Sequence, residues 1–141
     1  DLPIDPDQLE QRIGRLDRIG QRGDVHIHFA AFADSAQAAL YRWYDQALDA
    51  FRTSPQDGRE LYRRFGEELV ETARGFALAQ TNAGEQLDDL VGRTQAAHEE
   101  LAAAIQEGRD RLLELATQRA AADERLRRAM VAADADRSQD D

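Results

Sequence analysis

Four arginines stand between residues 11 and 23, a stretch that holds only one acidic residue. On a helix, Arg15 and Arg18 would lie on one face, because residues three apart are neighbours there. Two guanidinium groups on one face can hold the oxygens of a phosphoryl group in a fork that lysine cannot reproduce. Gly14 beside them would let a ligand or a neighbouring backbone come close. Such a pair could stabilise the charge that develops on phosphate oxygens during ATP hydrolysis.

The same spacing has a simpler interpretation. Arginines three residues apart on a helix commonly form a solvated face that pairs with nearby aspartate and glutamate. Spacing alone favours that interpretation. The complete string from Gln11 to Gln21, which reads Q-R-I-G-R-L-D-R-I-G-Q, favours phosphate binding instead.

That string resembles motif six of the Swi/Snf branch of superfamily-two helicases, whose signature is Q-R-x-G-R-x-x-R-I-G-Q. Later stretches are similar to the bacterial RNA polymerase-associated ATPases of that branch; these are residues 24–29, 42–44, 48–51 and 107–114. The resemblance implies that Arg15 and Arg18 reach the γ-phosphate of ATP across the cleft between two RecA-like lobes, with Arg18 as the main arginine finger.

The resemblance also assigns the rest of the motif. It implies that Gln11, Arg12, Gly14 and Gln21 lie on the nucleotide-binding side. The implied whole protein is an ATP-hydrolysing translocase on double-stranded DNA that associates with RNA polymerase and promotes its recycling in the bacterial cytoplasm. Its cofactors would be ATP and Mg²⁺.

Two parts of such a motor are missing from the sequence. The chain contains no G-x-x-x-x-G-K-[ST] phosphate loop and no acidic Walker-B strand to hold Mg²⁺. We therefore expect a piece of a longer protein that binds no nucleotide and hydrolyses no ATP by itself. The alternative from another class is a non-catalytic, coiled-coil-like protein-interaction module, for which the arginine string would be a coincidence.

The arginines need a helix that presents them. Asp5 can cap a helix that starts at Pro6, and Gly20 can end it in a left-handed conformation. Val25, Ile27 and Phe29 then alternate with histidines, which predicts one strand. A single strand cannot satisfy its own edges, so we expect its sheet to lie outside this chain.

Three further helices are predicted. One runs from Asp34 or Ser35 to about Arg52, and a second runs from about Arg59 to Gln80. The third starts near Glu85 and is expected to reach about Ala133, with residues 117–121 as the place for a break. Its apolar seam has near-heptad spacing and would be buried by antiparallel packing or by self-association. The seam comprises Leu87, Val91, Thr94, His98, Leu101, Ile105, Leu112 and Leu115.

The predicted fold class is therefore mainly α. Residues 1–31 would be the end of a second RecA-like lobe, with the motif-six helix and one late strand of an α/β lobe. Residues 32–134 would be an appended region of long antiparallel helices. Residues 135–141 are polar and are expected to be disordered.

Composition limits the remaining choices. A formal net charge of −10 argues against general binding of polyanions, and no apolar run is long enough to span a bilayer. His26 and His28 lack a third ligand nearby, so no metal site is predicted. The aromatic cluster at Tyr41, Trp43 and Tyr44 is expected to pack against the motor lobe rather than stack on bases. Exposed apolar helix faces would favour a homodimer.

Overall fold

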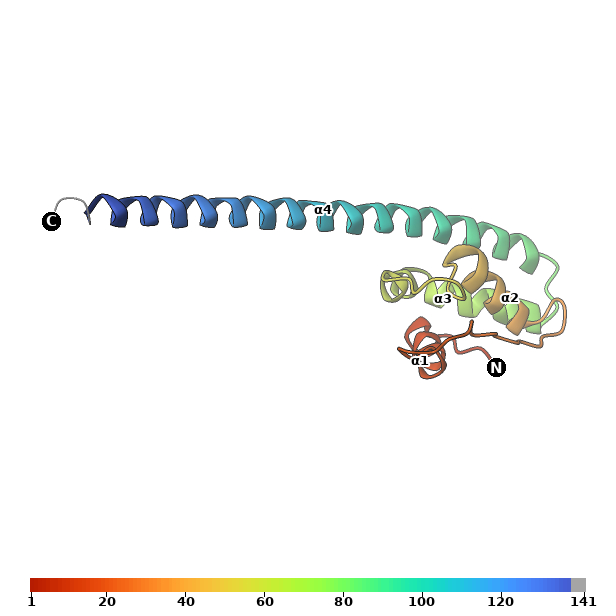
Figure 1. Ribbon diagram of the computed structural model, residues 1–141. Coiled ribbons are helices and arrows are strands. Elements are labelled where there is room, and N and C mark those ends of the chain that lie inside the picture. The colour runs from red at the N-terminus through yellow and green to blue at the C-terminus, as the bar shows by residue number, and fades with distance from the viewer. Residues whose placement is uncertain (138–141) are drawn as a thin grey trace. The chain divides into compact units, whose positions relative to one another are not determined.

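The computed structural model describes the backbone of residues 1–137 and the side chains of residues 1–131. This part of the chain is helical, as predicted. By contacts the chain divides into two compact units, residues 1–102 and 103–141. The elements are α1 (Pro6–Leu16), α2 (Ala36–Arg42), the π-helical turn η1 (Trp43–Ala47), α3 (Gly58–Ala77) and α4 (Ala83–Arg137) (Figure 1).

The first two helices start at the predicted caps. The Asp5 carboxylate accepts a hydrogen bond from the backbone N–H of Asp7 at 2.9 Å, and Pro6 takes the first helical position. The Ser35 hydroxyl accepts from the backbone N–H of Ala38 at 3.1 Å. Both caps satisfy a helix-end donor that has no partner within its own helix.

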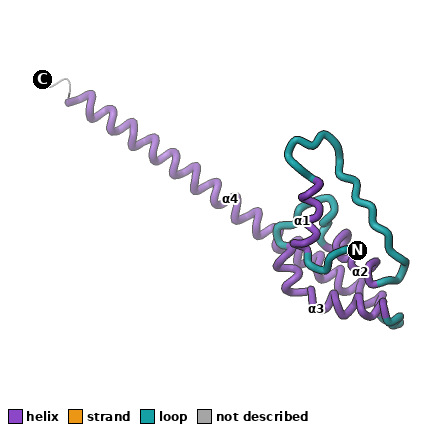
Figure 2. Tube along the Cα trace, turned by 90° about the horizontal axis from the view of Figure 1, so that it is seen from below, coloured by secondary structure: helices purple, strands orange, loops and turns teal. Residues whose placement is uncertain are grey.

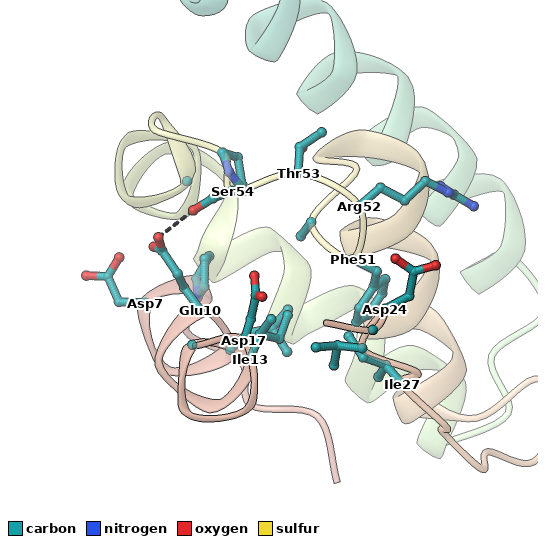
Figure 3. Close-up of a pocket in the computed structure, with 18 residues that line it drawn as sticks. Asp7, Glu10, Ile13, Asp17, Asp24, Ile27, Phe51, Arg52, Thr53 and Ser54 are labelled. Atoms are coloured by element: carbon teal, nitrogen blue, oxygen red, sulfur yellow. Dashed lines mark hydrogen bonds between the residues drawn. The ribbon is translucent and has the colours of Figure 1, made fainter. Parts of the chain in front are cut away.

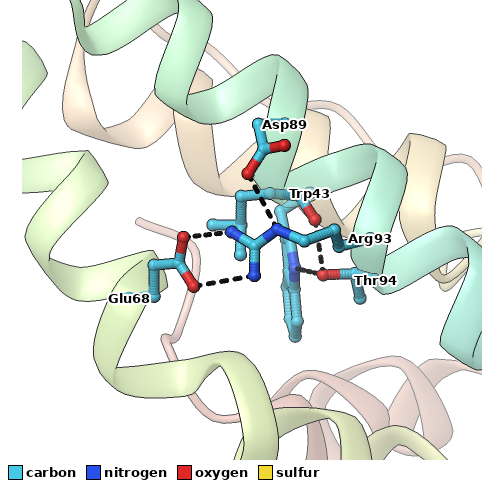
Figure 4. A network of polar contacts seen from close by, with 6 residues as sticks. Trp43, Glu68, Asp89, Arg93 and Thr94 are labelled. Atoms are coloured by element: carbon cyan, nitrogen blue, oxygen red, sulfur yellow. Dashed lines mark hydrogen bonds and ion pairs between the residues drawn. The ribbon is translucent and has the colours of Figure 1, made fainter.

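In the first unit, α3 and the start of α4 form an antiparallel hairpin. Asp57, just before α3, contacts His98 of α4 at 2.7 Å, and Glu68 farther along α3 forms an ion pair with Arg93 (Figure 4). The partners on α4 come earlier in the sequence as α3 advances, which defines the antiparallel arrangement. This part of the predicted fold is confirmed.

The core of the first unit centres on Trp43, whose side chain is fully buried. Its indole N–H donates to the Thr94 hydroxyl at 3.1 Å, and that hydroxyl donates to the carbonyl of Leu90 at 2.8 Å (Figure 4). Every buried polar group in this small network thus has a partner. The surrounding apolar side chains come from α2, η1, α3 and α4 and include Leu40, Leu48, Leu61, Leu69, Leu87 and Leu90.

A π-helical turn replaces the second half of the helix that was predicted to reach Arg52. It spans Trp43–Ala47, and the chain then turns at Asp49, whose φ is +49°. Trp43 and Tyr44 are sequence neighbours, yet both are fully buried. Trp43 contacts α4, whereas the Tyr44 hydroxyl contacts the first residues of the chain. Two adjacent aromatic side chains at the start of the turn therefore bond to two separate parts of the chain.

The predicted strand at Val25–Phe29 is wrong. Residues 22–34 form a loop between α1 and α2 (Figure 2), and no backbone hydrogen bond to this stretch occurs within the part of the chain that the structure describes. A strand needs a second strand to satisfy its backbone groups, and the described residues supply none. The segment is fixed instead by its side chains, since Phe29 stacks on Tyr41 with ring centroids 5.7 Å apart.

The first helix is also shorter than predicted. It ends at Leu16, where the backbone N–H of Asp17 donates to the Ile13 carbonyl at 2.9 Å. Gly20 has the expected positive φ, +93°, but lies in the following turn. Leu16 and Ile19 are exposed, so an added helical turn would bury no apolar surface and would lack tertiary stabilisation.

In the second unit, α4 continues without interruption through residues 117–121, where a break was considered. Charged pairs one turn apart support it, including Arg111 with Glu107 at 2.6 Å and Arg128 with Glu124 at 3.0 Å. Of the tail predicted to be disordered, residues 135–137 continue α4, and residues 138–141 lie outside the described residues. None of the helices described combines the length and the apolar character needed to cross a membrane.

Thr94→Val should leave the buried indole N–H of Trp43 without an acceptor. We expect the free energy of unfolding to fall by about 1–3 kcal/mol. Urea unfolding can be followed by the fluorescence of Trp43, the only tryptophan in the sequence. Thr117→Val is the matched control, because the Thr117 hydroxyl also donates four residues back along α4 but is exposed. Equal losses in the two variants would contradict this role for Thr94.

Candidate functional site

The predicted phosphate-binding residues lie on the last turns of α1 and in the turn after it. All six are exposed; they are Gln11, Arg12, Gly14, Arg15, Arg18 and Gln21. Because α1 ends at Leu16, Arg15 and Arg18 do not share a helical face. The turn brings them together in another way, since the Arg18 Nε–H donates to the Arg15 carbonyl at 3.3 Å. The Gln21 N–H in turn donates to the Arg18 carbonyl at 3.1 Å.

These arginines differ from the others in the first unit in lacking carboxylate partners. Arg12 donates to the Asp1 carbonyl at 2.8 Å, and among the described residues the Arg18 guanidinium donates only to the Arg15 carbonyl. Within the residues described, the guanidinium groups of Arg15 and Arg22 form no hydrogen bond or ion pair. By contrast, every arginine between residues 42 and 93 contacts an aspartate or glutamate; these are Arg42, Arg52, Arg59, Arg63, Arg64, Arg74 and Arg93.

This contrast bears on the simpler interpretation of the arginine spacing. A solvated face would pair its arginines with nearby carboxylates, and residues 42–93 show that pattern throughout. The stretch from Arg12 to Arg22 does not. Its guanidinium groups keep their positive charge accessible to an anion from outside the chain. Gly14 also stays open, since a Cβ atom added there would meet no other heavy atom within 4 Å.

The fold holds the first half of α1 against the rest of the unit. The Tyr44 hydroxyl lies 2.7 Å from the carbonyl oxygen of Pro3 and 2.9 Å from that of Ile4. Arg59 of α3 donates to the Asp7 carboxylate through Nε at 2.9 Å and a terminal nitrogen at 2.7 Å. The Leu9 side chain is buried below them. Arg15 stands at the far end of α1, so the helix is anchored at one end and presents arginine at the other.

Burial raises the pKa of the Tyr44 hydroxyl well above its usual value of 10.0, and the nearby Asp5 carboxylate adds to the shift. The neutral phenol is thus the form that the folded unit favours. Tyr44 also stacks edge-on against Trp43, with ring centroids 5.4 Å apart. Because both rings are buried, they cannot stack on nucleic-acid bases, whereas Tyr41 of the same cluster is 39% exposed.

A groove that the sequence did not reveal runs between α1, the loop after it and residues 50–58 (Figure 3). Its volume is about 620 Å³. Leu9, Ile13 and Phe51 supply apolar walls, and carboxylates line it as well, namely Asp7, Glu10, Asp17 and Asp24. The Glu10 carboxylate accepts a hydrogen bond from the Ser54 hydroxyl across the groove. The sequence signal was the row of acidic residues that flanks the apolar stripe of α1.

A second missed feature is the pair of Asp57 and His98. The Asp57 side chain is only 2% exposed; its Oδ2 lies 2.7 Å from His98 Nδ1, and its Oδ1 has no partner among the described residues. The pair joins the start of α3 to α4. His26 and His28 lie in the exposed loop far from it in sequence, and within the described side chains no three metal-ligand residues cluster.

The fold and site together define a helical-hairpin module with an exposed arginine segment at the end of a docked N-terminal helix. The family model described as "RNA polymerase recycling family C-terminal" matches residues 24–141, and the chain belongs to this family. The arginine segment lies before the matched residues.

Two relatives are RNA polymerase-associated proteins named RapA. The chain is 49% identical over 115 residues to the protein of Sodalis glossinidius (strain morsitans) and 46% identical over 115 residues to that of Cronobacter sakazakii (strain ATCC BAA-894). Each alignment covers 82% of this chain and 11% of the relative. The chain therefore spans about a tenth of the length of the curated relatives it matches.

Tyr44→Phe should remove the bonds that hold the carbonyls of Pro3 and Ile4. We expect a loss of about 1 kcal/mol in the free energy of unfolding at pH 7–8, measured by urea titration. Because folding raises the pKa of Tyr44, its contribution is fully present below the unfolded value of about 10 and is lost as the pH rises above it.

The two proteins should therefore converge in stability above about pH 10. Tyr41→Phe is the control, since Tyr41 is partly exposed and its ring keeps its stacking contacts. A constant difference between Tyr44→Phe and the parent chain from pH 7 to 11 would show that the phenol is not the titrating group.

Proposed function

We propose that this chain is the junction between the motor and the helical region of an RNA polymerase-associated ATPase. In this proposal Arg15 and Arg18 serve as arginine fingers, and the helical hairpin connects them to the part of the protein that meets the polymerase. The observation that carries the proposal is that the arginine segment has no carboxylate partner among the side chains described, in a chain whose net charge is −10. The family and the relatives' printed name support the association with RNA polymerase.

The nucleotide in this proposal is bound elsewhere in the protein. A phosphate loop requires a lysine, and the sequence contains none. Another part of the protein would therefore supply the phosphate loop and the ligands for Mg²⁺. The arginines would meet the terminal phosphate from across a cleft, with Gln11, Arg12, Gly14 and Gln21 beside it. By itself the chain would hydrolyse no ATP.

In this proposal the anchoring of α1 couples the position of the arginines to the position of the hairpin. Tyr44 and Arg59 hold the start of α1 on the hairpin, while Arg15 and Arg18 stand at the free end. A partner that moves the hairpin would thereby move the arginines relative to a nucleotide. We assign that partner role to RNA polymerase, with double-stranded DNA as the track and recycling of the polymerase as the outcome, in the bacterial cytoplasm.

A second candidate function is a non-catalytic protein-interaction module. One observation favours it, because the family model begins at Asp24 and leaves the arginine segment outside. The helical unit would then bind its partner without any contribution from Arg15 or Arg18. The two functions make opposite predictions for arginine substitutions.

In the whole protein, Arg15→Ala and Arg18→Ala should each lower kcat for ATP hydrolysis, with the double variant reduced about 10³-fold, because charge on the γ-phosphate oxygens would lose its stabilisation. Nucleotide affinity should change little. Steady-state phosphate release and binding of a fluorescent ATP analogue measure the two quantities.

Arg63→Ala is the matched control, since Arg63 is equally an exposed arginine but pairs with Glu60 on α3. It should retain full turnover. If the double variant turns over ATP like the parent and still binds RNA polymerase, the interaction-module function is correct. ATP turnover by the 141-residue chain alone would contradict the assignment of the phosphate loop to another part.

A further inference from the structure

The second unit exposes a regular apolar seam. Along α4 the positions that repeat every seven residues as a and d continue from the buried Val91 and Thr94 into residues 105–129. In the first unit this register faces the core. Beyond residue 102 its leucine side chains are exposed, with Leu112 at 68%, Leu115 at 61% and Leu126 at 62%, whereas Ile105 is partly buried. A helix within a protein gains most of its stability by packing its apolar face against a partner. This face has no partner within the described residues.

Large and small residues alternate along the seam in a fixed order. The a positions hold long side chains, and the d positions hold small ones with one exception, Leu115. The a positions are Ile105, Leu112, Arg119 and Leu126, and the d positions are Gly108, Leu115, Ala122 and Ala129. The order matters because two paired helices must fill each layer of their interface to native density.

A parallel pair in register would pack poorly. Each residue would then meet its own copy, so Gly108, Ala122 and Ala129 would each face the same small residue, leaving three layers nearly empty. Arg119 would face Arg119, which places two like charges at the centre of the seam. Voids and like charges both oppose this arrangement.

An antiparallel pair fits much better. With the two-fold axis at the level of Thr117, each a residue meets a d residue of the other copy. The layers become Ile105 with Ala129, Leu112 with Ala122, Arg119 with Leu115, and Leu126 with Gly108, each formed twice. Every layer joins one large and one small side chain, apart from the layer in which the aliphatic stem of Arg119 covers Leu115.

The flanking charges are compatible with this pairing. Arg109 and Asp123 occupy e positions, and the antiparallel register places them opposite one another twice. Arg111 and Arg125 would face one another at g positions, but Arg111 already carries an ion pair with Glu107 at 2.6 Å, which reduces their repulsion. We propose that the seam of residues 105–129 pairs with the same seam of a second copy in an antiparallel coiled coil.

Sedimentation equilibrium of the 141-residue chain tests the association. At about 50 µM we expect an average mass approaching twice the 15.8 kDa of one chain. Leu112→Arg should raise the dissociation constant about tenfold or more, because it puts a charge in a large-to-small layer. Leu113→Arg is the matched control, since Leu113 is also 68% exposed but lies outside the seam.

Circular dichroism should show the same helicity for both variants, so that a loss of pairing is separated from a loss of folding. A monomer at this concentration would overturn the proposal. So would a dimer that Leu113→Arg weakens as much as Leu112→Arg does, because its contact would then lie off the seam.

Disulfide cross-linking tests the orientation of the two helices. The chain has no cysteine, so any disulfide must form at the introduced residue. Ala116→Cys should form an intermolecular disulfide readily, since this e position meets its own copy next to the two-fold axis. Leu126→Cys should not, because the two copies of that residue would lie about 27 Å apart along the helices. A disulfide at residue 126 with none at residue 116 would establish the parallel pair and overturn the antiparallel one.

Discussion

The first unit depends on the burial of two adjacent aromatic side chains, Trp43 and Tyr44, which contact each other and bond to different parts of the chain. In an α-helix successive residues lie about 100° apart around the axis, so sequence neighbours do not share a face. At the start of the π-helical turn Trp43–Ala47, the indole of Trp43 reaches Thr94 and the phenol of Tyr44 reaches the carbonyls of Pro3 and Ile4. The hairpin and the N-terminal segment therefore share one anchoring point. Disturbing it affects both the core and the placement of α1.

Charge distribution gives the unit its second organising feature. The chain is acidic overall, and the arginines of α2, α3 and the start of α4 form ion pairs with carboxylates. These exposed pairs contribute little stability individually. Their effect is to leave the segment from Arg12 to Arg22 as the place where positive charge is not neutralised locally. An anion that approaches an otherwise repulsive surface would find its favourable contacts there.

The sequence predicted those elements whose causes are local. Asp5 and Ser35 act as caps through bonds within three residues, and the stripes of α3 and α4 reflect helical periodicity. The strand at Val25–Phe29 failed because alternation describes what a segment would do beside a partner strand, and says nothing of whether that strand is present. The end of α1 at Leu16 was missed for a related reason, since the exposure of Ile19 depends on what packs there.

The candidate site could likewise be predicted only in part from the sequence. The positions of Arg15 and Arg18 near one another followed from their spacing, although the contact is made by a turn rather than by a helical face. Their lack of carboxylate partners could not be predicted, because it depends on the tertiary placement of every acidic side chain. Asp57 illustrates the limit well. The Asp57-Gly58 pair is typical of a turn, whereas the burial of Asp57 against His98 joins residues 41 positions apart.

The loop of residues 17–35 has a consequence for how tightly α1 belongs to the unit. No backbone hydrogen bond reaches residues 22–34 within the described chain, so α1 is attached by its own contacts rather than by its connection. Its docking is then an intramolecular binding equilibrium. A tether of this length holds a released segment at an effective concentration on the order of millimolar. Contacts that would be too weak between separate molecules therefore suffice to keep the arginines in place.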